Sequence, residues 1–177
     1  MRLVYGIDPD YAPKMPFNRA DYFITSIDTS GNRIVPKRCA PNTGVLVKAV
    51  VNHNDGGFTY LPLLDCVADM QVIYGMDLDN DKDFEPLVAL SLDGYSEDLT
   101  ATSSQTIRDQ VKQVRVYILA HEGQKDPTYT YPSSTVSLGG DVSLGRTFNL
   151  ATRIGDPEYK NYRWKLYTIV VTPNNLE

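Results

Sequence analysis

Two segments of the chain alternate apolar and polar residues with the period of two that marks a half-buried β-strand. They are QVRVYILAH, residues 113–121, and YRWKLYTIVV, residues 162–171. One face of each would carry these side chains: Val114, Val116, Ile118 and Ala120 in the first, and Tyr162, Trp164, Leu166 and Thr168 in the second. An α-helix repeats about every 3.6 residues instead, so the pattern predicts two long strands in a sheet with one covered face.

Shorter segments rich in β-branched and aromatic residues complete this picture. We expect further strands over residues 21–27, 44–51, 57–62, 68–75 and 86–92, with turns at 28–32 and 53–57. The spacing before residue 68 also fits a single helical turn. Residues 93–106 read as a polar loop, the stretch from Ile107 to Val114 as a short helix or bend, and 122–145 as a long surface excursion with short strands.

The pattern as a whole predicts an α+β fold that is mostly β, with antiparallel strands and little helix. The 12 glycines and 11 prolines favour many turns over long helices. Residues 1–177 are the length of a single globular domain, in which residues 1–20 form an irregular N-terminal segment.

Charge and motifs exclude several classes of function. With 17 basic against 22 acidic residues the net charge is −5, and the basic residues are scattered, which argues against a nucleic-acid partner. No segment reaches the roughly 18 consecutive apolar residues of a membrane span. GxSxG, GxGxxG and GxxxxGK[ST] motifs do not occur, and His53 and His121 lie beside turns, so we expect no enzyme. Trp164, with its neighbouring tyrosines, fits core packing better than a sugar-binding platform.

The two cysteines, Cys39 and Cys66, lie 27 positions apart. Without a CxxC pair or nearby histidines they do not form a zinc motif. Two buried free thiols in a cytosolic protein are one reading. The Tyr- and Thr-rich, Gly- and Pro-punctuated sequence looks exported, which favours a disulfide between them.

Acidic residues follow the predicted strand at 68–75 at every second position. They are Asp77, Asp79, Asp81 and Asp83, with Glu85 two positions later. The first three match positions 1, 3 and 5 of an EF-hand loop, but Lys82 replaces the glycine at position 6 and Val88 the glutamate at position 12. This excludes an EF-hand. A solvated acidic turn is the favoured interpretation, and a weak Ca²⁺ site formed by these five residues is the alternative.

The block LLDCVADMQVIYGMDLDNDKDF, residues 63–84, resembles a recurring block of the PilW-type minor pilins of type IV pili. Its matching positions are Leu63, Asp65, Val67, Asp69, Met70, Gln71, Val72, Tyr74, Gly75, Asp77, Asp79 and Asp81. A second block matches at Val111, Val114, Arg115, Val116, Ile118 and Leu119, and the end of the chain from Tyr162 resembles the family's closing strand.

The resemblance implies a pilin-like globular head domain that helps to initiate or tip a filament, with other pilins of the same filament as partners. It implies the bacterial inner membrane or periplasm before assembly and the extracellular pilus afterwards. A pseudopilin of type II secretion, and an extracellular module that binds calcium or sugar, are the alternatives.

The chain departs from the family pattern at two places. Family members begin with a basic leader, a cleavage-site glycine and an apolar helix, none of which is present, so we expect a soluble head that meets the membrane only through a missing helix. Relatives often show D-x-D-G-D-G, whereas Asn80 and Lys82 occupy the glycine positions here, which weakens the calcium interpretation.

Overall fold

A six-stranded antiparallel sheet forms the frame of the protein in the computed structural model, which describes residues 20–52, 55–82, 84–85, 93–142 and 144–173. The strand order is β1 (Ala20–Thr25), β2 (Gly44–Val51), β3 (Phe58–Met76), β5 (Val111–Glu122) and β8 (Arg163–Val171), and β4 (Gly94–Ser96) pairs with the end of β3. A separate hairpin consists of β6 (Thr135–Leu138) and β7 (Arg146–Asn149). Among the described residues, helix occurs in α1 (Ser104–Gln110), α2 (Leu150–Arg153) and the 3₁₀ turn η1 (Glu158–Asn161). The predicted antiparallel, mostly β fold is confirmed.

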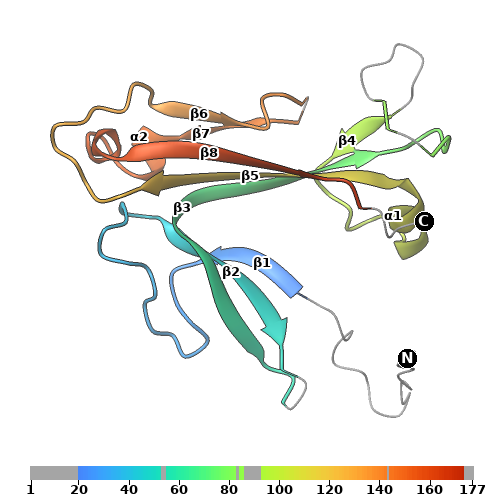
Figure 1. Cartoon of the computed structure of the whole chain (residues 1–177), viewed down its shortest axis with the longest axis horizontal. Helices are drawn as coiled ribbons and strands as arrows, with labels where there is room; N and C mark the ends of the chain where they lie inside the picture. Colours follow the sequence, from blue (N-terminus) through green and yellow to red (C-terminus); the bar gives the residue numbers. More distant parts are fainter. Residues whose placement is uncertain (1–19, 53–54, 83, 86–92, 143, 174–177) are drawn as a thin grey trace.

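The long strand β3 divides this sheet into two arms (Figure 1). Its first half pairs with β2 and its second half with β5, and Val67 faces both Gly44 and Ala120. On each side of Val67 the register shifts, so that β3 carries an extra residue relative to its partner. Extra residues of this kind bend a strand and increase its twist. The arms diverge at this bend around Val67, the joint of the sheet.

The helical turn that the spacing before residue 68 also allowed does not form. That segment is continuous strand, because β2 and β5 satisfy its backbone on the two sides of the joint. At the joint itself Cys66 has a φ of 58°, a left-handed conformation uncommon for a residue other than glycine.

The largest core lies in the arm formed by β3, β5 and β8. Tyr117, Leu119 and Trp164 are buried there beneath β6, β7, α2 and η1, and the Trp164 Nε1–H donates to the carbonyl of Tyr159 at 2.9 Å. Trp164 is therefore a core residue, as predicted. A smaller core around Val35, Val45 and Val47 supports the other arm. Burial of a valine or leucine side chain in such a core contributes about 1.5–3 kcal/mol to the free energy of unfolding.

The remaining predicted segments fall mainly in the connections. The stretch 93–106, expected as a polar loop, carries β4 and the start of α1, whose N-cap Ser103 accepts from the backbone of Thr106. The expected strand at 86–92 lies outside the described residues. Within 122–145 the chain forms β6, and Leu138 is fully buried in the larger core. In the described part of the chain, no helix is long and apolar enough to cross a membrane.

Candidate functional site

The acidic segment follows β3 and is organised by Asp77. Only 1% of this residue is exposed, and its carboxylate accepts from the backbone N–H groups of Asn80 at 2.6 Å and Lys82 at 2.9 Å. The ammonium group of Lys112 lies 3.9 Å from the same carboxylate. Two charge-assisted hydrogen bonds to backbone groups within the turn make Asp77 the residue that closes it.

Two further carboxylates meet Asp77 at the surface. Asp79 and Asp81 are exposed, and one oxygen from each of the three residues lies within 4.8 Å of the others. The φ angles of Asn80 and Lys82 are 63° and 79°, so both positions adopt the left-handed backbone that glycine favours. Asn80 and Lys82 therefore adopt the backbone conformation that glycine would adopt at these positions of the pattern.

Of the five residues predicted to bind calcium, three thus converge. Glu85 is exposed and outside this group, and its backbone N–H donates to the Asp93 carboxylate at 2.6 Å. Asp83 lies outside the described residues. Calcium requires about six to eight oxygen ligands, and two oxygens of the Asp77 carboxylate already bind backbone groups. Calcium binding stays a prediction from the sequence.

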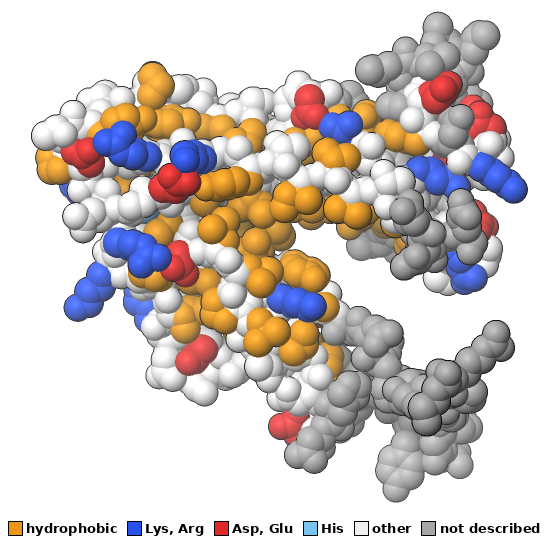
Figure 2. Space-filling view, viewed as in Figure 1, with side chains coloured by type: hydrophobic (Ala, Val, Ile, Leu, Met, Phe, Trp, Pro, Cys, Tyr) orange, Lys and Arg blue, Asp and Glu red, His pale blue; other side chains and the backbone are white. Residues whose placement is uncertain are grey.

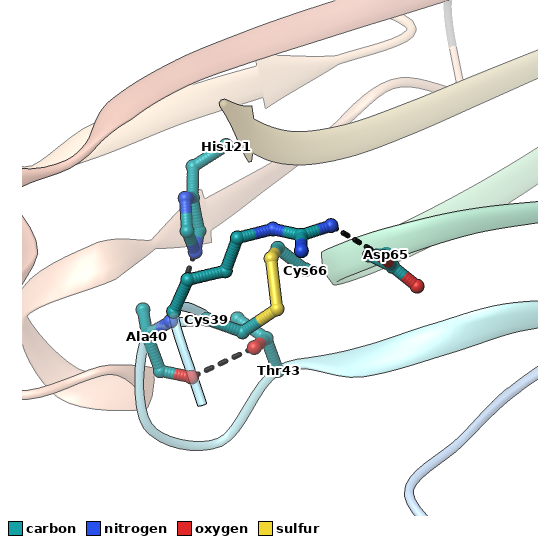
Figure 3. The surroundings of a disulfide bond; sticks show 7 residues. Cys39, Ala40, Thr43, Asp65, Cys66 and His121 are labelled. Atoms are coloured by element: carbon teal, nitrogen blue, oxygen red, sulfur yellow. Dashed lines mark hydrogen bonds and ion pairs between the residues drawn. A yellow bond between two sulfur atoms is a disulfide. The ribbon is translucent and has the colours of Figure 1, made fainter. Parts of the chain in front are cut away.

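The predicted disulfide between Cys39 and Cys66 is confirmed, with an S–S distance of 2.01 Å. It ties the loop between β1 and β2 to the joint (Figure 3). Beside it, the Arg38 guanidinium donates to the Asp65 carboxylate at 2.6 Å. His121 lies close enough to complete a group of potential metal ligands with the two sulfurs, but cysteines joined in a disulfide are not thiolate ligands.

His121 was placed beside a turn by the sequence analysis, which gave it no structural role. It is 4% exposed, and its Nε2 accepts the Ala40 backbone N–H at 2.9 Å, as Figure 3 shows. Burial, together with the smaller effect of the Arg38 charge, lowers the pKa of His121 to about 4, although a hydrogen bond with the backbone of Glu122 opposes the shift. The imidazole is therefore neutral at physiological pH and carries its proton on Nδ1. With Nε2 committed to Ala40, the ring acts as a structural acceptor.

The polar residues of the block 63–84 anchor neighbouring segments in the same way. Asp69 accepts two hydrogen bonds of 2.8 Å from the Arg146 guanidinium, which lies at the start of β7. The Gln71 side chain donates to the carbonyl of Leu144 at 2.9 Å. These contacts hold the β6–β7 hairpin against β3. The block therefore works as a frame that positions loops, and its polar residues are largely occupied in doing so.

One family model matches most of the chain. The family model described as type IV pilus-assembly protein W matches residues 22–175, from β1 to just beyond β8. No curated protein and no solved structure matches the chain. Because the family match includes both arms, the joint and the acidic turn, the chain belongs to the type IV pilus-assembly protein W family.

Proposed function

We propose that the protein is a minor pilin whose head domain initiates or tips a type IV pilus by packing against other pilins of the filament. Family membership gives it a role in type IV pilus assembly, in the cell envelope and together with other pilus components. The family match over residues 22–175 is the observation that carries the proposal.

The hydrogen bonds made by the block 63–84 support a role in which partner proteins recognise the shape of the surface. Asp69, Gln71 and Asp77, all within the block 63–84, fix loops and turns through hydrogen bonds inside the chain. His121, the buried histidine, holds the disulfide loop through Ala40. In the proposed role these groups keep a rigid surface in place, and partner subunits recognise that surface without any chemical step.

A deletion strain tests the proposal. We expect loss of the gene to reduce surface pili strongly, and the full-length gene to restore them, because a filament without its initiating subunit nucleates poorly. The measurement is the amount of major pilin sheared from the cell surface, with total pilin in the cells as the control.

Secretion by a type II system provides the contrasting readout. If the deletion blocks secretion of that system's substrates and leaves pili unchanged, the protein is a pseudopilin and the proposal is wrong. If pili are present but shortened or uncapped, with normal numbers, initiation is excluded and only the tip role stands.

A further inference from the structure

Strand β8 is an edge of the main sheet with a free outer side. It pairs with β5, and no second partner for it occurs among residues 20–52, 55–82, 84–85, 93–142 and 144–173. An edge strand presents a row of backbone N–H and C=O groups that can pair with another chain. Folded proteins usually block such edges with charges, prolines, bulges or short length.

The strands at the two ends of the order, β1 and β8, differ in this respect. β1 has six residues and includes the charged Asp21. β8 has nine residues, and its last six, 166–171, contain neither charge nor proline. The register of β8 with β5 is regular from Arg163 to Val171, so no bulge bends this edge away. The means that commonly protect an edge are therefore missing along most of β8.

Exposed apolar side chains concentrate on the same strand. Of the ten large apolar side chains that are most exposed in the described part of the chain, five belong to β8. They are Leu166 (38% exposed), Tyr167 (36%), Ile169 (47%), Val170 (48%) and Val171 (48%). Figure 2 shows hydrophobic side chains along this arm and on the wall of the notch between the two arms.

Both faces of β8 contribute to this surface. Tyr167, Ile169 and Val171 lie opposite Ile118, Val116 and Val114 of β5, and therefore share one face with them. Leu166 and Val170 point to the other face. A strand added at the outer edge would thus extend an apolar surface on each side of the sheet, in addition to forming backbone hydrogen bonds.

We propose that β8 binds an extended strand of a different protein of the pilus assembly, which continues the main sheet at this edge. The partner segment has about six residues or more in β conformation, since residues 166–171 offer that length. It is uncharged where it faces these residues and carries apolar side chains at alternate positions. This inference rests on the proposed function, because it names the surface through which the head domain meets its neighbours.

Charge pattern argues against a second copy of β8 as the occupant. Antiparallel pairing of two β8 strands over their full length places Arg163 opposite Val171 and Lys165 opposite Ile169. Parallel pairing in register places Arg163 opposite Arg163 and Lys165 opposite Lys165, and like charges directly opposite destabilise a sheet. Both cations already form ion pairs within the chain, Arg163 with Asp126 and Lys165 with Glu122. A different strand that pairs only with residues 166–171 and ends before Lys165 avoids both mismatches.

Complementation of the deletion strain with full-length variants tests the inference. In the double variant Ile169→Lys/Val171→Lys, two ammonium groups lie on the edge, and we expect surface pili to fall at least tenfold. The double variant Ile169→Thr/Val171→Thr keeps β-branched residues and the backbone ladder, and we expect it to retain at least half of the pili. The matched control is Ile27→Lys, since Ile27 is as exposed as Ile169, at 47%, but lies outside β8; it should behave as wild type.

The outcomes distinguish a failure of the β8 docking inference from a failure of the proposed function. If wild-type complementation restores pili and the double lysine variant restores them equally well, with equal protein levels, the edge inference is wrong and the function stands. If the deletion leaves pilus assembly unaffected, the proposed function is wrong. Loss of pili in the threonine variant to the level of the lysine variant would show that side-chain burial, and not strand addition, is required.

A photo-crosslinking residue at position 169 identifies the occupant. We expect an adduct between the full-length protein and a different pilus component, identified by mass spectrometry, with the linked peptide in an uncharged β-type segment. The adduct should disappear when Val171→Lys is added and persist with Ile27→Lys. A homodimeric adduct would overturn the assignment to a different protein.

Discussion

Reduction of the Cys39–Cys66 disulfide should lower the melting temperature of the protein by about 9 °C. The disulfide closes a loop of 27 positions. In the chain-entropy model, a cross-link of this length destabilises the unfolded state by about 3.5 kcal/mol at 25 °C. Unfolding entropy is about 2.1 cal/mol/K per residue, which for 177 residues gives about 0.37 kcal/mol/K. The ratio of these two values is the expected shift.

Calorimetry or circular dichroism of the oxidised and reduced wild-type protein measures this shift without changing the volume of any side chain. A Cys39→Ala/Cys66→Ala variant should melt at or slightly below the reduced protein, because Cys66 is buried and its truncation leaves a small cavity. Urea titration should also give a larger m-value after reduction, since the unfolded chain is then less compact.

Two results would refute this reasoning. A melting temperature that falls by less than about 3 °C would show that the cross-link removes little freedom from the unfolded chain, because residual structure already restricts the loop. A large fall with an unchanged m-value would place the effect in the native state, for example in the uncommon backbone conformation of Cys66.

Three further predictions concern the joint and the acidic turn. The pKa of His121, about 4 against 6.5 when unfolded, means that the unfolded chain takes up this proton first, so about 3 kcal/mol of stability present above pH 6.5 is lost as the pH falls to 4. His121→Gln should flatten that part of the pH–stability curve, and an unchanged slope would assign it to carboxylates. Gly75→Ala should cost about 1–3 kcal/mol in urea unfolding, because its new Cβ would lie 2.6 Å from the Phe84 ring; a cost near zero would mean that the ring moves aside. Asp77→Ala should cost about 2 kcal/mol in EDTA as well as in calcium, since it leaves backbone N–H groups unpaired; a loss seen only with calcium would show that metal closes the turn.

Local pattern was sufficient to predict most strands. The segment 44–51 coincides with β2, and the segment 162–171 contains β8, because β-branched residues are frequent in both. The covered face was not predicted correctly: β2 is buried on both faces, and Leu166 and Thr168 of β8 are exposed. The bend in β3 could not be predicted in this way. It depends on β2 and β5 pairing with opposite halves of one strand, and those pairings join residues distant in sequence.

In the candidate site, too, local features could be predicted from the sequence, whereas contacts between distant residues could not. The alternation of Asp77, Asp79 and Asp81 indicated an acidic turn, and the three carboxylates lie close together in it. That Asp77 is buried and binds the backbone depends on its position at the end of a buried strand. His121 shares a face with the buried Tyr117 and Leu119, which is not the face that the alternation had indicated. Its acceptor role also requires Ala40, which is 81 positions away.

The disulfide and His121 should act as one unit at the joint. Ala40 is the residue that follows Cys39, so the cross-link holds its N–H in place for His121 Nε2. If reduction frees this loop, the neutral imidazole loses its donor and its burial weakens, and the pKa of His121 should move back towards 6.5. Reduction and acidification would then remove overlapping contributions, so their combined cost should be smaller than the sum of the separate costs. Since the joint also sets the angle between the arm that ends in β1 and the arm that ends in β8, loosening it should impair docking at β8 without altering any residue of that edge.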